Sequence, residues 1–454
     1  MPYSGDINPD GHSDHKGAWP ADVYYGDMNG IWTDATINNT VATGTRNDNT
    51  PGDKKFDQSY IPSDIELQMG RVDMANMSSF SSTETQLLEM YLDKDHDYRH
   101  KNFIAIHRGV IDDNFGYFSG EAFAASGWKN FAPLVGSSNV NANDYFTTMA
   151  TNSYLWSYGC GAGSYTSCSG IGSTTNFTTS NLQSVFTVLF GSYFGDWDSQ
   201  NNFLRAPLAQ GKTLTSVWSG RPHWQFHHMG LGENIGYNVR LSQNNSSLYY
   251  ASYYGRLVHS ALMGDPTLRN DVVAPVSNVV AVKAGTNCSI TWTASADVVL
   301  GYHIYRKYDT SDYVRVNSSL ITGTSYNDTG LAGTGTYTYM VRAMLLQTSP
   351  SGTYYNLSQG ITSDSSSTLA VTILENIPSV SIWPNPANDI FQININRVVQ
   401  GEIRITNMLG SEVWKGTINA NSATVNVANL PAGCYNLSII SKTTAIHQKI
   451  MIVR

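Results

Sequence analysis

The sequence predicts a multidomain chain in which an α/β domain with a parallel sheet is followed by two all-β sandwich domains. Three observations support this. The length of 454 residues suits roughly three domains. Short apolar runs alternate with helical stretches over residues 1–272, and the pattern becomes alternating and β-rich from Pro275 onward. Charged residues are only 14% and aromatic residues 11%, which is typical of a folded chain.

The charge and hydropathy of the chain exclude two classes of protein. The net charge is −8, whereas a nucleic-acid binder usually carries a basic face. No run of about 18 apolar residues occurs, so we expect no transmembrane segment. The first residues have neither the basic start nor the apolar core of a signal peptide.

The first domain contains one clear helix and four apolar runs. Thr83 and Gln86 form a capping-box pattern, which predicts a helix over 82–95, and a second helical stretch covers 119–134. The runs that we expect to be buried strands are 103–106, 154–156, 185–190 and 214–218. Functional groups gather at the carboxyl ends of parallel strands. Those ends are 107–113, 159–168, 191–198 and 220–228.

The second domain, residues 273–370, has the pattern of a small sandwich. Short alternating strands are expected at 289–292, 301–306 and 337–343. Trp292 comes early and Tyr337 late in this stretch, which resembles a fibronectin type III domain. A Ser-rich linker, 363–368, follows it.

The third domain, residues 376–454, carries an ordered set of motifs. These are P-N-P-A at 384–387, N-x-x-G at 407–410, L-P-A-G-x-Y at 430–435, and a basic apolar tail. The set resembles the type A C-terminal sorting domain of type IX secretion, as found in Bacteroidota. The resemblance implies the type IX machinery as a partner and a secreted or outer cell-surface location. It also implies an N-terminal export signal, so we expect the chain to be N-terminally truncated.

Three segments of the first domain resemble gingipain-type cysteine peptidases. They are 22–30, with its aspartates and aromatics, 66–72, with a Gly-Arg pair, and 261–268, with a G-D-P motif. The likeness spans about residues 20 to 270. It implies a caspase-like α/β fold for 1–272.

The same resemblance locates the candidate catalytic residues. The family's His lies in a G-H-G turn after one strand, and its Cys ends the next strand. Here Cys160 stands at the His position and Ser192 at the Cys position, so both dyad residues are replaced. Because a thiol or hydroxyl needs a base to become nucleophilic, we expect an inactive or altered peptidase domain. The alternative is an active cysteine endopeptidase that pairs Cys160 with one of the candidates His223, His227 and His228.

These residues are also compatible with structural, non-catalytic roles. Cys160 also suits a structural role, either as a buried thiol or in a disulfide with Cys168. His223 and His227 lie four apart and would share a face of a helix, but the stretch also suits a packed aromatic segment. No Glu stands between the histidines, which argues against a zinc protease.

A third hypothesis is a carbohydrate-active or adhesive surface protein with an extracellular protein or polysaccharide as partner. Asp196 and Asp198 flank Trp197 at a strand end, a composition found in glycoside hydrolases. Carboxylates two residues apart on one loop rarely straddle a sugar, however.

The candidate metal ligands lie near the N-terminus. Asp6, Asn8 and Asp10 form a D-x-N-x-D-G opening, with Asp14 in the ninth place, and such alternate oxygens suit calcium. Gly17 replaces the Glu of the twelfth place, so a plain solvated turn is an equal alternative. We therefore expect no required cofactor, with structural calcium as the candidate ion.

Overall fold

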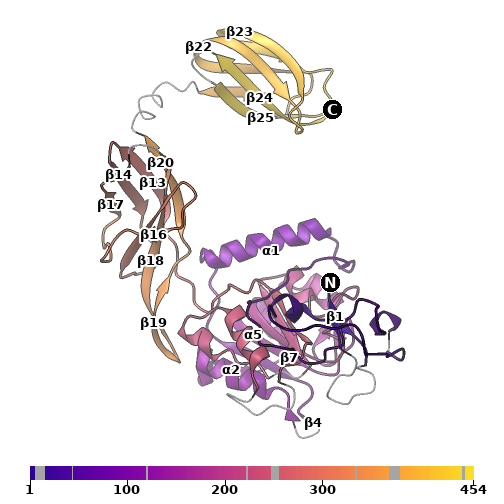
Figure 1. Cartoon of the computed structure of the whole chain (residues 1–454). Helices are drawn as coiled ribbons and strands as arrows, with labels where there is room; N and C mark the ends of the chain where they lie inside the picture. Colours follow the sequence, from indigo (N-terminus) through magenta and orange to yellow (C-terminus); the bar gives the residue numbers. More distant parts are fainter. Residues whose placement is uncertain are drawn as a thin grey trace. The chain divides into compact units, whose positions relative to one another are not determined.

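The computed structural model describes residues 1–5, 16–42, 44–118, 121–220, 223–246, 255–332, 335–367, 379–441 and 445–454. The chain forms two compact units (Figure 1). The first unit comprises residues 1–281, 290–328 and 334–364, and the second comprises 282–289, 329–333 and 365–454. The predicted boundary at 370–376 falls outside the described residues.

A six-stranded sheet forms the centre of the first unit. Its order is β12-β11-β10-β7-β3-β6, and all neighbours are parallel except β12 beside β11. The carboxyl ends of β3, β7, β10 and β11 therefore meet at one edge, called here the carboxyl edge. The strands are β3 (Gly109–Asp113), β6 (Val140–Ala142), β7 (Tyr154–Cys160), β10 (Ser184–Phe190), β11 (Thr215–Ser219) and β12 (Ser260–Gly264).

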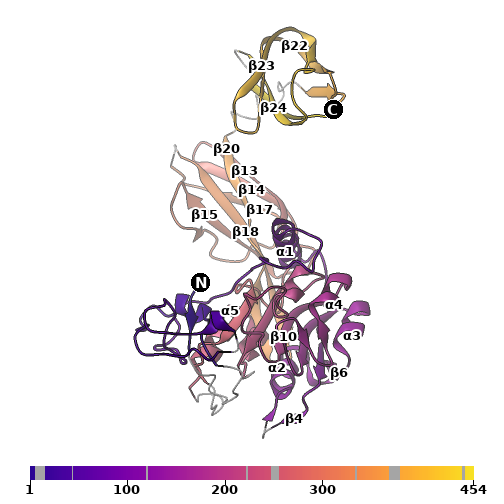
Figure 2. The same cartoon turned by 90° about the vertical axis from the view of Figure 1, so that its right-hand side faces the viewer.

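Helices cover both faces of this sheet (Figures 1 and 2). Successive residues of a strand point to opposite faces. Tyr158 reaches Phe123, just before α2, while Ser157 bonds Thr187, which bonds Tyr145 of α3. The helices are α1 (Glu84–Arg99), α2 (Ala125–Val135), α3 (Tyr145–Thr151), α4 (Thr174–Thr179) and α5 (Ile235–Asn244), with 3₁₀ turns η2 (Asp22–Tyr25), η3 (Thr45–Asn47), η4 (Ser137–Asn139), η5 (Ala206–Ala209) and η6 (His227–Leu231).

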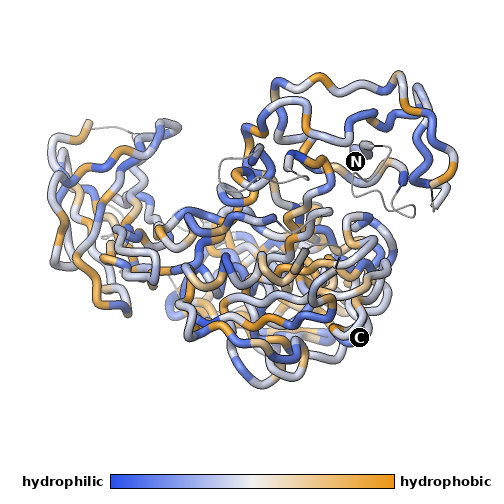
Figure 3. Tube along the Cα trace, turned by 90° about the horizontal axis from the view of Figure 1, so that it is seen from below, coloured by the Kyte–Doolittle hydropathy of each residue, from blue (hydrophilic) through white to orange (hydrophobic). Residues whose placement is uncertain are grey.

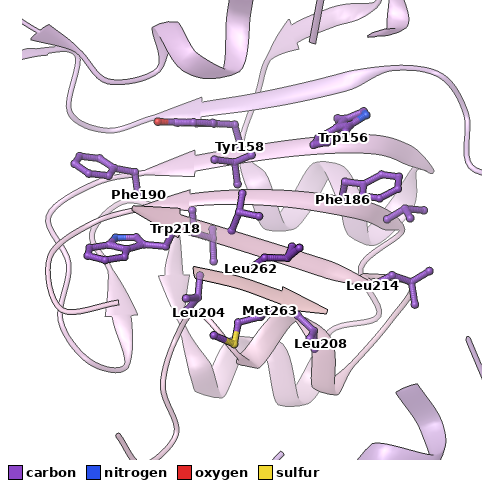
Figure 4. Packing of buried hydrophobic residues seen from close by; sticks show 14 of the residues in the cluster. Trp156, Tyr158, Phe186, Phe190, Leu204, Leu208, Leu214, Trp218, Leu262 and Met263 are labelled. Atoms are coloured by element: carbon purple, nitrogen blue, oxygen red, sulfur yellow. The ribbon is translucent and has the colours of Figure 1, made fainter. Parts of the chain in front are cut away.

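Full burial of the central strands confirms that they are covered on both sides. Every residue of β7 and β10 is buried, which is typical of a parallel sheet between helical layers. Figure 4 shows the aromatic side chains of this core: Tyr158, Phe190 and Trp218 lie toward one end of the sheet, and Trp156 and Phe186 toward the other. The capping box of Thr83 and Gln86 forms as predicted.

The strand predicted at 103–106 is wrong. The first strand of the six-stranded sheet, β3, begins at Gly109 instead. Ile104 and Ile106 are 73% and 50% exposed. A Cβ atom at Gly109 would lie 2.8 Å from the ring of Phe131 in α2. The strand therefore begins where α2 packs directly against the Gly109 backbone. Phe103 packs on Tyr98 of α1, which explains its apolar character without a strand.

The N-terminal segment, residues 1–5 and 16–60, is largely irregular. It contains β1 (Tyr3–Ser4) paired with β2 (Trp19–Pro20), and it contacts the loop that follows β10 and Trp218 near the end of β11. Short hairpins are also formed by β4 (Tyr117–Phe118) with β5 (Glu121–Ala122) and by β8 (Ser167–Cys168) with β9 (Gly172–Ser173).

The β-sandwich region follows from Ser277. Its strands pair as one eight-stranded set in the order β16-β15-β18-β20-β13-β14-β17, with β19 beside β18. Trp292 packs edge-on against Tyr302 at 5.3 Å in its core. The strands are β13 (Ser277–Ala284), β14 (Asn287–Thr293), β15 (Gly301–Tyr308), β16 (Val314–Arg315), β17 (Ser325–Asp328), β18 (Tyr337–Ser349), β19 (Gly352–Leu357) and β20 (Ile361–Ser367).

The C-terminal module is a five-stranded antiparallel sheet in the order β21-β22-β24-β25, with β23 beside β22. Alternate residues of β22, among them Phe391, Ile393 and Ile395, are buried. Figure 3 shows hydrophobic and hydrophilic segments interspersed along the trace of the whole chain. Its strands are β21 (Val380–Trp383), β22 (Ile390–Thr406), β23 (Glu412–Asn426), β24 (Gly433–Ser441) and β25 (Ala445–Ile452). None of the helices in the described part of the chain combines the length and apolar character that a membrane crossing requires.

Candidate functional site

Cys160 ends β7 at the carboxyl edge, and its thiol is fully buried. The Sγ atom donates a hydrogen bond to Oδ1 of Asp113, at 3.2 Å, from the end of the neighbouring strand β3. Asp113 Oδ1 also accepts the backbone N–H groups of Phe115 and Gly116, at 3.1 and 2.9 Å. The carboxylate is thus held in a tight turn with one side toward the thiol.

This environment opposes formation of a thiolate. Burial raises the pKa of Cys160 far above its usual range, and the hydrogen bond to Asp113 and the negative charge of that carboxylate raise it further. Activated cysteines have the reverse arrangement, with a positive group that lowers the pKa of the thiol. Asp113 lies in a strand-end segment that the sequence singled out, but only the pairing of β3 with β7 shows that it meets Cys160.

Cys160 and Cys168 are both free thiols in the structure, so the candidate disulfide is absent. Cys168 is buried as well, and its Sγ lies 3.9 Å from the carbonyl oxygen of Phe190. Burial also raises the pKa of Cys168. Both thiols are therefore buried and protonated, as is typical of structural cysteines.

Ser192 follows β10 and lies in the turn beside the one that carries Cys160. A Cβ atom on Gly163 would come within 2.4 Å of the backbone N and O atoms of Ser192, so the two turns pack backbone against backbone. A Cβ on Gly191 would likewise meet the carbonyl oxygen of Gly161 at 2.8 Å. Glycine is required at both positions for this close approach.

The three candidate histidines lie on other elements. His227 and His228 begin η6, which packs against α2, α5 and β19, and their rings are 4.3 Å apart. Burial lowers the pKa of His227, and the charges of His228 and Lys129 lower it further. His223 precedes η6 in a non-helical segment, so it does not share a helix face with His227. It lines a small cavity beside Ser219, at the end of β11.

The two carboxylates after β10 hold the N-terminal segment. Arg46 forms ion pairs with Asp196 and, at 3.1 Å, with Asp198, while Tyr3 donates a hydrogen bond to Asp198. Asn47 adds a bond of 3.3 Å to Asp196. Burial raises the pKa of Asp196 to about 6 in spite of the opposing Arg46 charge. Asp196 and Asp198 therefore bind residues of the N-terminal segment, whereas the two carboxylates of a glycoside hydrolase face a substrate cleft.

Trp19 of the N-terminal segment covers the same region of the carboxyl edge. It is 4% exposed and packs against Trp218 at 6.2 Å, Tyr193 at 6.5 Å and His259 at 5.5 Å between ring centres. Trp218 in turn donates a hydrogen bond of 2.9 Å to the carbonyl oxygen of Gly191. Trp19 and Arg46 were missed by sequence reasoning, because an irregular segment without periodicity does not reveal what it packs against.

The calcium candidates Asp6, Asn8, Asp10 and Asp14 lie outside the described residues. Over the rest of the chain that the structure describes, no three His, Cys, Asp or Glu residues gather as a metal site would require.

The motifs of the C-terminal module tie its ends together. Asn385 bonds the backbone of β25 twice, to Lys449 O at 3.1 Å and from Met451 N at 2.8 Å. Asn407 accepts from the amides of Leu409 and Ser411 at 3.0 Å, closing its turn. The Arg454 guanidinium donates to several carbonyl oxygens, among them those of Val427, Ala428 and Leu430.

A family model described as "Secretion system C-terminal sorting domain" matches residues 381–453. The C-terminal module is a type IX sorting domain. The protein is therefore secreted or held at the outer cell surface.

Further comparisons found partial similarities. The Ulvan lyase NLR42 of Nonlabens ulvanivorans is 32% identical over 89 residues, which is 19% of this chain and 16% of that enzyme's length. The Arg-specific cysteine proteinase gingipain R is similar in structure with a TM-score of 0.38 and 11% identity, over 96% of this chain and 79% of its own. A fibronectin-type-III-like protein from Clostridium thermocellum has a TM-score of 0.17 and 22% identity, over 21% of this chain and 95% of its own.

Proposed function

We propose that this chain is a type IX-exported surface protein whose α/β module is caspase-like, related to the gingipain-type peptidases, and not catalytic. It acts by binding an extracellular protein or polysaccharide. The observation that carries the proposal is the hydrogen bond from the buried Cys160 thiol to the Asp113 carboxylate. The mainly parallel sheet with helices on both faces supports the caspase-like part of the proposal.

A cysteine peptidase needs a thiolate and a base that can return the proton to the leaving group. The polar partner of Cys160 is instead an acceptor with a negative charge, which keeps the proton on sulfur. Ser192 stands in the second dyad position, and a serine hydroxyl depends on a base even more strongly. The two dyad residues act together in catalysis, so replacing both should remove most of the activity.

The alternative, an active peptidase that pairs Cys160 with one of the three histidines, requires a different arrangement. β11, after which His223 follows, is separated from β7 by β10, and strands lie about 4.8 Å apart. His227 and His228 pack with α2 and α5. The Cys160 thiol donates its hydrogen bond to Asp113 instead.

Alkylation of Cys160 tests the proposal. We expect iodoacetamide at pH 6 to modify Cys160 in the native protein more slowly than it modifies a model thiol, and at the ordinary rate in urea. Peptide substrates with Arg, Lys or other residues at the cleavage site should remain intact. Cys168→Ser is the matched control, because it removes the neighbouring buried thiol and leaves Cys160 in place.

Rapid modification of Cys160 in the native protein, with a parallel loss of peptidase activity, would show that the module is an enzyme. The class of partner is tested separately by incubating the protein with an oligosaccharide array and with extracellular matrix proteins. Retention on sugars alone would assign a carbohydrate ligand.

A further inference from the structure

A cavity of about 180 Å³ in the first unit is lined by two arginines that form no ion pair with any described residue. It lies where the segment after β12 meets β18 and β19. Arg99, Arg269 and Arg342 all line it, and Asp271 is the one acidic residue among the lining residues of the described chain. Thr267 and Gln359 add neutral polar groups.

The three arginines differ in what they already bind. Arg99 is fully engaged, with ion pairs to Asp95 at 2.8 Å and Asp265 at 2.6 Å. Toward the residues that the structure describes, Arg342 uses only its Nε atom, which donates to the carbonyl oxygen of Ser358 at 2.8 Å. The side chain of Arg269 makes no hydrogen bond or ion pair to any described residue.

The positive charges of Arg269 and Arg342 are close enough to act on each other. Burial lowers the pKa of Arg342, Tyr305 opposes this, and the charge of Arg269 lowers it further. Arg342 is half-buried, and an anion between it and the exposed Arg269 would offset the repulsion of their like charges.

Asp271 does not supply that anion. Its side chain is 3% exposed, and its carboxylate already accepts hydrogen bonds from Tyr354 at 3.1 Å and Asn270 at 3.2 Å. His107 lies 3.3 Å from its other oxygen. No ion pair joins Asp271 to Arg269 or Arg342 in the part of the chain that the structure describes.

We propose that this cavity is a binding site for a compact oxyanion, held between the guanidinium groups of Arg269 and Arg342. Guanidinium groups recognise sulfate, phosphate and carboxylate through paired charge-assisted hydrogen bonds. The ligand is a free inorganic ion or the same group carried as an ester on a larger molecule. The site is independent of the carboxyl edge and of the proposed lack of catalysis.

Isothermal titration of the full chain with sodium sulfate and sodium phosphate tests the site, at an ionic strength held constant with chloride. We expect the wild-type chain to bind, and Arg269→Gln and Arg342→Gln to bind about tenfold or more weakly, the effect of losing one charge-assisted hydrogen bond. Arg315→Gln is the control, because it removes an exposed positive charge from the same β-sandwich region.

Two further measurements distinguish loss of binding from loss of folding, and a free ion from an ester on a larger molecule. The Arg269 side chain is exposed and bonds no residue that the structure describes, so Arg269→Gln should melt at the wild-type temperature in chloride alone. A glucose phosphate ester that binds more tightly than phosphate would assign the group to a larger molecule, and weaker binding would assign a free ion. Absence of anion binding by the wild-type chain, or wild-type affinity in both arginine variants, would overturn the proposal.

Discussion

The Cys160 thiol and the His259 imidazole are both buried, and burial moves their pKa values in opposite directions. In each case burial favours the neutral form, which for an acid raises the pKa and for a base lowers it. The pKa of His259 falls to about 4, and its Nε2 atom lies 2.8 Å from the carbonyl oxygen of Ser4. His259 thus stays neutral while it holds the N-terminal segment.

Stability should consequently depend on His259 between pH 6.5 and 4. The folded state binds fewer protons than the unfolded state in that window, so the contribution is complete above 6.5 and is lost as the pH falls toward about 4. The pKa difference limits the effect to roughly 3 kcal/mol. Urea unfolding at a series of pH values should show a flatter pH dependence for His259→Asn than for wild type.

His447→Asn provides the comparison, because it removes an exposed histidine from the C-terminal module. Parallel pH curves for wild type and His259→Asn would contradict the assignment.

At the scale of elements, the N-terminal segment depends on the connection after β10. Arg46→Gln should leave the buried Asp196 carboxylate without its cation. Arg46 itself is 39% exposed, so the expected loss is about 2 kcal/mol rather than the larger cost of a fully buried pair. Chemical unfolding monitored by tryptophan fluorescence would measure it, since Trp19 packs against Trp218.

Lys54→Gln removes an exposed charge from the same segment and should leave stability unchanged. If Arg46→Gln and Lys54→Gln behave alike, the ion pair contributes nothing measurable.

At the scale of the whole molecule, the break in composition at Pro275 is not an exposed linker. Val273, Ala274 and Val276 are 1%, 7% and 2% exposed. Hydrogen bonds also join the β-sandwich region to the α/β module, among them Ser351 Oγ to Pro133 O at 2.7 Å. We therefore expect limited proteolysis to spare residues 272–276 and to cut between 364 and 379.

Mass spectrometry of the fragments would check this, since protease sites need exposed backbone. A stable fragment that ends near 275 would show that the α/β module and the β-sandwich region separate, as composition alone suggests.

The sorting domain should be needed for export but not for folding of the first unit. Deletion of 376–454 from a precursor with an export signal should trap the protein in the periplasm, with circular dichroism of the remaining module unchanged. Unchanged display at the cell surface would refute the role of this module.

The sequence by itself determined the modules that local patterns specify. Short, mainly apolar runs identified three of the sheet strands, alternation identified the β-rich regions, and the ordered motifs from Pro384 to Tyr435 identified the sorting domain. The run at 103–106 misled because apolar composition does not show whether a side chain lies in a buried strand, packs on a helix as Phe103 does, or is exposed as Ile104 is.

Only the tertiary structure decided the chemistry of the candidate site. The pairing of Cys160 with Asp113 joins residues 47 positions apart, and that of Arg46 with Asp196 joins residues 150 positions apart. Such contacts depend on strand order and on where an irregular segment lies, and neither is encoded in local periodicity. The pKa of a thiol depends on these neighbours, so composition and motif could name Cys160 but could not tell nucleophile from structural thiol.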